Sequence, residues 1–144
     1  ISLIGDKYTE TLQLLKLQSM PLLQHTVLEG ICTKCKHLHT LEIGGNLQFP
    51  PSTAIDVLNW APNLVKLDLS ETRISDAALQ RIAQSNLGAL GMFKTTGYTE
   101  NGFAALSEGC PAMTHLYVNN PKVNSLVKVM WNMRREKKII FVHG

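Results

Sequence analysis

A short apolar pattern, Leu-x-x-Leu-x-Leu, recurs along the chain and limits its fold more than any other feature. The pattern begins near residues 12, 38, 64, 87 and 113, and a terminal strand near residue 139 continues the register. The first, fourth and sixth positions of these units are all apolar, although only 44% of the residues are hydrophobic. Because repeated units bury their apolar faces against one another, the spacing predicts that residues 1–144 form a single domain of stacked units. We expect this domain to belong to a longer chain, since residues 4–8 resemble the entrance of a further repeat helix.

Within each unit the apolar spacing changes from alternation to the spacing of a helix, which is typical of a strand followed by a helix. The third unit alternates over residues 64–69, and Ser75 then precedes apolar residues at helical intervals. Ser75 has the chemistry of a helix N-cap, and Thr53 with Asp56 matches a capping box in the second unit. The sequence therefore predicts the α/β class, with a parallel sheet in one layer and helices in another.

Two further patterns carry a family resemblance. Units close with Cys110-Pro111-Ala112-Met113 and Cys35-Lys36-His37-Leu38, and a helix starts at Ile74-Ser75-Asp76. Together with the leucine spacing, these segments resemble the leucine-rich repeat family, and more narrowly its cysteine-containing subtype in F-box/leucine-rich-repeat proteins. The resemblance implies a horseshoe solenoid with a parallel β-sheet on the concave face and helices on the convex face. The family favours Asn or Cys at the ninth position, which only Asn46 matches, so we expect irregular loops at Met20, Thr72, Thr95 and Pro121.

Strand alternation also predicts which side chains meet a partner. If the fourth and sixth positions point into the core, the third, fifth and seventh line the opposite face of the sheet. Phe93, Tyr117 and His115 then form an aromatic site of the kind enriched at interface hot spots. In the alternative interpretation, Phe93 and Tyr117 only cover an irregular loop of the fourth unit. A mixed-charge strip and one amide complete the candidates, namely Lys16, Glu42, Lys66, Asp68 and Asn119.

The sequence contains no Gly-rich phosphate loop, no Gly-x-Ser-x-Gly elbow and no His-Glu-x-x-His motif. We therefore expect neither an enzyme nor a small-molecule substrate or cofactor, but a scaffold that binds a protein partner on the concave sheet. The family resemblance implies one version, the substrate-recognition part of a cullin-type ubiquitin ligase, docked through an upstream F-box. The alternative is a structural subunit of a large intracellular assembly, such as an axonemal, ribosome-associated or mitochondrial complex.

Cys32, Cys35, His37 and His39 offer four possible zinc ligands within one short segment. Zinc sites usually take two ligand pairs separated by a loop, whereas these cysteines end a predicted helix and the histidines begin a predicted strand. We therefore expect buried thiols and no metal. A zinc or thiol site at Cys32 and Cys35 is the remote alternative.

The charge of the chain does not identify a partner, because its net value is only +3. The basic run at residues 134–138 fits the end of the last helix better than a nucleic-acid contact, since cations there complement the helix dipole. No apolar run is long enough to span a bilayer, and three cysteines are too few for a disulfide scaffold. The sequence thus predicts an intracellular protein, with the cytoplasm as first expectation and the nucleus or an organelle left open.

Overall fold

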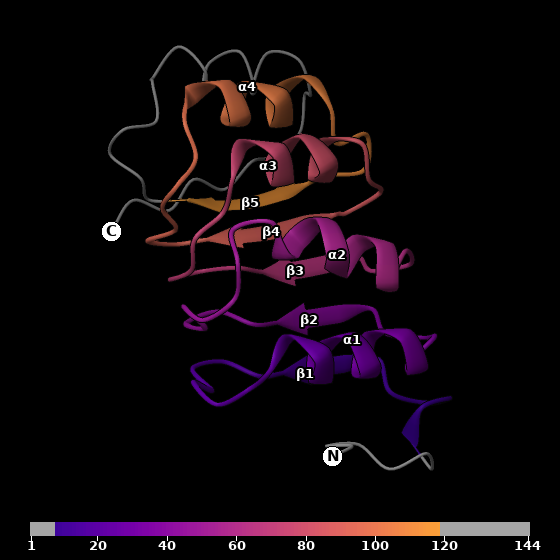
Figure 1. Cartoon of the computed structure of the whole chain (residues 1–144). Helices are drawn as coiled ribbons and strands as arrows, with labels where there is room; N and C mark the ends of the chain where they lie inside the picture. The colour runs from indigo at the N-terminus through magenta and orange to yellow at the C-terminus, as the bar shows by residue number, and fades with distance from the viewer. Residues whose placement is uncertain (1–7, 119–144) are drawn as a thin grey trace.

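Within residues 8–118, five short parallel strands form one sheet, in which they lie in the same order as in the sequence. The computed structural model describes residues 8–118, so the terminal strand expected near residue 139 and the basic run at 134–138 lie outside the described residues. Figure 1 shows the helices gathered on one side of this sheet and following the same order along it. The elements are β1 (Leu14–Lys16), α1 (His25–Lys34), β2 (Thr40–Glu42), α2 (Thr53–Trp60), β3 (Lys66–Asp68), α3 (Asp76–Ala83), β4 (Ala89–Met92), α4 (Glu100–Glu108) and β5 (His115–Val118).

The strands align in the register that the repeat predicts. The third position of each unit pairs with the third position of the next, from Leu14 with Thr40 to Ala89 with His115. The leucines at the fourth position therefore stand side by side across the sheet, at Leu15, Leu41, Leu67, Leu90 and Leu116. This register confirms the α/β class and the parallel sheet.

The hydrophobic core lies between the sheet and the helices. In the units that begin at 38, 64, 87 and 113, the first, fourth and sixth positions are all buried. Burial of each such side chain stabilises the fold by roughly 2 kcal/mol before conformational entropy is subtracted. Leu12 and Leu15, in the unit of the edge strand β1, are only partly buried. None of the helices between residues 8 and 118 has the length and apolar character needed to cross a membrane.

Successive units share the same turn after the strand. The residue at the eighth position has a left-handed backbone in four units, with φ values of 52° at Ser19, 75° at Gly45, 57° at Glu71 and 53° at Lys94. Glycine adopts this conformation without steric cost, so only Gly45 carries a sequence signal for it. In the other three units, the left-handed backbone is sterically unfavourable for a residue with a side chain, so hydrogen bonds of the neighbouring residues must stabilise it.

The ninth position holds this turn in place even where it is not asparagine. Thr95 donates a 2.9 Å hydrogen bond from its hydroxyl to the carbonyl of Leu69, and the hydroxyl of Thr72 donates to the same carbonyl. Both threonines are buried. The expectation of irregular loops at Thr72 and Thr95 is therefore wrong, because a threonine hydroxyl takes over the donor role of an amide. Pro121 lies outside the described residues.

The two predicted helix caps differ in outcome. Ser75 is the N-cap of α3, and its hydroxyl accepts a 3.1 Å hydrogen bond from the backbone N–H of Ala78, as predicted. The capping box at Thr53 is wrong, since Ser52 occupies the N-cap position of α2 and Thr53 is already helical. The hydroxyl of Thr53 donates instead to the carbonyl of Pro50 at 2.6 Å, which removes it from the capping role.

Candidate partner-binding face

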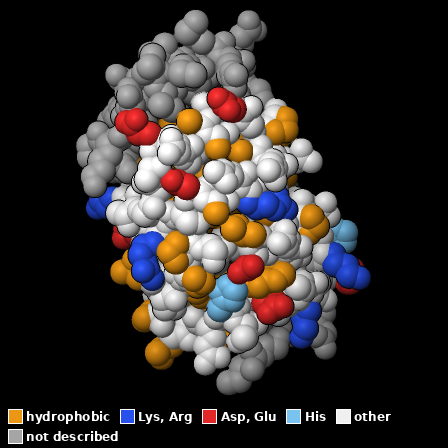
Figure 2. Space-filling model, turned by 45° about the horizontal axis from the view of Figure 1, so that its top comes forward, with side chains coloured by type: hydrophobic (Ala, Val, Ile, Leu, Met, Phe, Trp, Pro, Cys, Tyr) orange, Lys and Arg blue, Asp and Glu red, His pale blue; other side chains and the backbone are white. Residues whose placement is uncertain are grey.

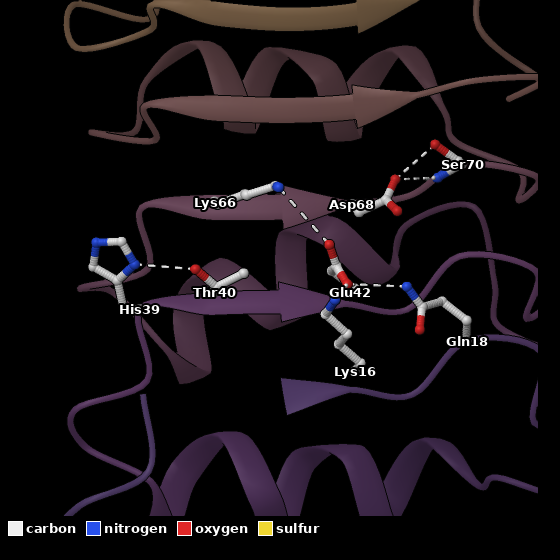
Figure 3. Close-up of polar contacts among 8 residues, drawn as sticks. All are labelled: Lys16, Gln18, His39, Thr40, Glu42, Lys66, Asp68 and Ser70. Atoms are coloured by element: carbon white, nitrogen blue, oxygen red, sulfur yellow. Dashed lines mark hydrogen bonds and ion pairs between the residues drawn. The ribbon is translucent and has the colours of Figure 1, made fainter. Parts of the chain in front are cut away.

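None of the four helices within residues 8–118 covers the second side of the sheet, which carries alternate residues of every strand. Figure 3 is seen from this side, with the helices behind the strands. These residues point away from the buried leucines of the fourth position, because successive side chains of a strand lie on opposite faces. The sheet face is defined by the third, fifth and seventh positions of the units. The third and fifth are Leu14, Lys16, Thr40, Glu42, Lys66, Asp68, Ala89, Gly91, His115 and Tyr117, and the described seventh positions are Gln18, Gly44, Ser70 and Phe93.

Three side chains surround Glu42 on the sheet face (Figure 3). Lys16 Nζ lies 3.5 Å from Glu42 Oε2, and Lys66 Nζ lies 3.8 Å from Oε1. Gln18 donates a 3.0 Å hydrogen bond from Nε2 to Oε2. The Glu42 side chain is only 12% exposed, whereas the side chains of Lys16 and Lys66 are 59% and 41% exposed. Exposed ion pairs contribute at most about 1 kcal/mol each, so this group compensates the charge of Glu42 more than it stabilises the fold.

Asp68 belongs to a separate hydrogen-bonded group. Ser70 donates to Asp68 Oδ1 twice, from its backbone N–H at 3.0 Å and from its hydroxyl at 2.6 Å. The hydroxyl of Ser70 in turn accepts a 3.0 Å hydrogen bond from the backbone N–H of Phe93. The four charged candidates therefore do not form one strip: Lys16, Glu42 and Lys66 come together, and Asp68 turns toward Phe93.

A glycine on the neighbouring strand makes room for the Asp68 carboxylate. A Cβ atom at Gly91 would lie 2.3 Å from Asp68 Oδ1, well inside van der Waals contact. Gly91 pairs with Asp68 on one side and with Tyr117 on the other. The carboxylate consequently lies against β4, next to the aromatic residues that follow.

The structure brings the three predicted aromatic residues into contact. The ring centroids of Phe93 and Tyr117 are 6.2 Å apart with a tilt of 48°, and those of Tyr117 and His115 are 6.3 Å apart and nearly parallel. His115 Nδ1 lies 2.8 Å from the hydroxyl of Thr114. All three rings are half-buried, so each keeps part of its surface open to a partner. Asn119, the last predicted contact residue, lies outside the described residues.

The candidate zinc ligands do not converge. Cys32 and Cys35 are buried, with 1% and 2% of their surface exposed. Burial raises the pKa of the Cys32 thiol to about 12, which disfavours the thiolate that binds metal. His37 is exposed, and His39 Nδ1 lies 3.0 Å from the hydroxyl of Thr40. Across residues 8–118, no group of three or more His, Cys, Asp or Glu side chains could hold a metal ion.

On the helical side, His25 links α1 to α2. The centroid of its ring lies 5.1 Å from that of Trp60 and 6.1 Å from that of Phe49, with both pairs in a T-shaped arrangement, and its Nε2 lies 3.4 Å from Asp56 Oδ2. Figure 2 shows charged side chains of both signs scattered among hydrophobic ones over this side of the molecule. His25 of α1 thus contacts two residues of α2.

Three residues that shape the sheet face are not among the predicted contact residues. Gln18 and Ser70 occupy the seventh position of their units, which the strand alternation already assigned to this face. Gly91 lies at a fifth position, but only the close approach of Asp68 shows why it must lack a side chain.

Comparison with protein-family models and with curated proteins gave no match for this chain. The fold and the candidate site together define an α/β protein with a parallel sheet, one side of which is left open by the helices of residues 8–118.

Proposed function

We propose that this chain is a leucine-rich repeat solenoid that works as a non-enzymatic scaffold and binds a protein partner on the sheet face. The repeated register, the repeated left-handed turn and the repeated pattern of buried leucines support the solenoid. The observation that carries the binding role is the contact among Phe93, Tyr117 and His115 on a face that none of α1 to α4 covers. Half-buried aromatic rings of this kind supply much of the binding energy at protein interfaces.

The aromatic rings do not have to be explained by an irregular fourth loop. Lys94 has the same left-handed backbone as the corresponding residues of other units, and Thr95 holds the turn through its bond to Leu69. Since the loop is regular without help from the rings, their exposure favours a binding role. The group around Glu42 would then orient a partner, because exposed charges affect specificity and association rate more than affinity.

The resemblance supports a narrower role, recognition of substrates for a cullin-type ubiquitin ligase. A structural subunit of a large intracellular assembly is the alternative. Three buried thiols fit a reducing compartment, which both roles share. The two roles differ in their companions: a ligase core with exchangeable substrates in the first, and one constant complex in the second.

Affinity purification with mass spectrometry from the native cell tests the binding role. The parent protein is compared with a Phe93→Ala/Tyr117→Ala variant, after equal melting temperatures have been verified. A matched control is Leu22→Ala/Leu47→Ala, which removes exposed apolar side chains, 92% and 62% exposed, that are not part of the sheet face. We expect the first variant to lose a partner that the control retains.

Retention of every partner by the aromatic variant would contradict binding on the sheet face. Recovery of a ligase core together with the lost partner would favour substrate recognition. Recovery of one fixed complex by all three proteins would instead favour the structural subunit.

A further inference from the structure

The two carboxylates of the sheet face have different surroundings. Glu42 lies between Lys16 and Lys66, so its negative charge is already compensated. Asp68 accepts hydrogen bonds only from the neutral Ser70, and no cationic side chain within residues 8–118 lies at ion-pair distance from it. Both bonds from Ser70 use Oδ1, which leaves Oδ2 with its lone pairs for a further donor.

The uncompensated carboxylate adjoins the aromatic rings. The hydroxyl of Ser70 donates to Asp68 Oδ1 and also accepts from the backbone N–H of Phe93. This serine therefore holds the carboxylate close to the backbone nitrogen of Phe93. Gly91, over which the carboxylate lies, is the register partner of Tyr117. A negative charge and two tilted ring faces therefore share one small area of the sheet face.

This combination has the chemistry that recognises an organic cation. Aromatic ring faces attract a cation through their quadrupole, and a carboxylate oxygen accepts a strong, charge-assisted hydrogen bond from a guanidinium group. Arginine satisfies both at once, because its planar guanidinium stacks on a ring while its edge donates to a carboxylate. Lysine has only a point charge and no flat surface that could stack on a ring. A neutral side chain has no positive charge for the rings or the carboxylate to attract.

We propose that Asp68, Phe93 and Tyr117 form a subsite for an arginine side chain of the protein partner. The proposal rests on the partner-binding role of the sheet face and names the chemistry of the segment that is bound there. Asp68 pairs with the guanidinium through Oδ2, and the rings of Phe93 and Tyr117 contact its flat surface. Glu42 takes no part, since its lysine partners repel a second cation.

An NMR titration of the full 144-residue chain tests this subsite. The probe is a blocked pentapeptide with one arginine between glycines, and its control is the same peptide with citrulline, which has nearly the same shape and no charge. We expect saturable shifts of the backbone amides of Ser70, Gly91, Phe93 and Tyr117 with the arginine peptide. Citrulline should bind at least tenfold more weakly.

Two isosteric variants separate the subsite from a general charge effect. Asp68→Asn keeps the acceptor for Ser70 and removes the charge, and it should weaken binding of the arginine peptide at least tenfold. Glu42→Gln removes a charge from the same face and should change binding less than twofold. If Asp68→Asn does not fold, Tyr117→Leu provides a second test. It removes one aromatic ring of the subsite and should likewise weaken binding of the arginine peptide.

The subsite is overturned if the arginine peptide causes no saturable shifts, if citrulline binds equally well, or if Asp68→Asn binds as well as the parent. Those results would leave the scaffold role intact when Phe93→Ala/Tyr117→Ala still loses a partner in cells. Conversely, binding of the arginine peptide without any partner that depends on the rings would support the subsite and contradict the scaffold role.

Discussion

Asn46 donates a 2.7 Å hydrogen bond from its side-chain amide to the backbone carbonyl of Leu17, 29 residues earlier in the chain. Its Oδ1 accepts a 2.8 Å bond from the backbone N–H of Met20, and its amide also donates to the carbonyl of Ile43 at 2.8 Å. Asn46 is fully buried. One side chain therefore satisfies backbone groups of two successive units. It also bonds the loop of the first unit, where Met20 stands at the ninth position and has no polar side chain for this purpose.

Replacement of this amide should be costly. Asn46→Ala leaves several buried backbone groups without a partner, and each such group costs about 1–3 kcal/mol. We expect the free energy of unfolding to fall by about 2–4 kcal/mol, measured by urea denaturation. Asn63→Ala, at an exposed position, is the control and should change stability little. A loss of equal size in both variants would contradict the bridging role of Asn46.

The helix caps offer a matched pair of serines. Ser75→Ala removes the hydroxyl that accepts from Ala78, so it should destabilise the protein by about 1 kcal/mol. Ser52 is the N-cap of α2 but makes no capping bond with its side chain. Ser52→Ala should therefore change stability by less than about 0.5 kcal/mol in the same denaturation experiment. The reverse order would mean that α2, not α3, depends on a side-chain cap.

Asp76 makes stability depend on pH in the acid range. Hydrogen bonds from the hydroxyl of Thr99 at 2.6 Å and from its backbone N–H at 2.7 Å lower the pKa of Asp76 below its ordinary value of 3.8. Because the pKa is depressed in the folded state, this carboxylate stabilises the fold fully above pH 3.8. The contribution disappears as the pH falls below that value through the folded-state pKa.

Asp76→Asn removes this proton linkage. We expect lower stability than the parent at pH 6 and a smaller loss between pH 5 and pH 2, both measured by thermal unfolding. Glu29→Gln, an exposed carboxylate on α1, is the charge-matched control and should retain the acid dependence of the parent. An unchanged acid limb in Asp76→Asn would contradict the linkage.

The cysteines test the remote thiol alternative. Burial raises the pKa of the Cys32 thiol to about 12, so its reactive thiolate is strongly disfavoured at pH 8. All three cysteines are buried, so native protein should react with iodoacetamide far more slowly than protein unfolded in urea. Rapid native labelling of Cys32 or Cys35 would revive a thiol or metal site.

The predictable part of the candidate site was its aromatic half. Phe93 follows Gly91 by two residues, and Tyr117 is the register partner of Gly91 on the next strand. The repeat register alone therefore places the two aromatic residues together. The electrostatic half was not predictable, because the register places Glu42 opposite Asp68, a second carboxylate, and not opposite Lys66. Only the side-chain conformations show that Lys66 pairs with Glu42 while Asp68 turns to Ser70.

The sequence by itself determined the class of fold, the strand register and the identity of the buried leucines. It could do so because apolar periodicity is local, and a slip by one residue would expose every leucine of a strand. The tertiary structure decided which polar groups satisfy one another, as when Thr95 replaces an amide and Gly91 makes way for Asp68. Those pairings depend on distances of a few ångströms between neighbouring units, which stacking sets and spacing along the chain does not encode.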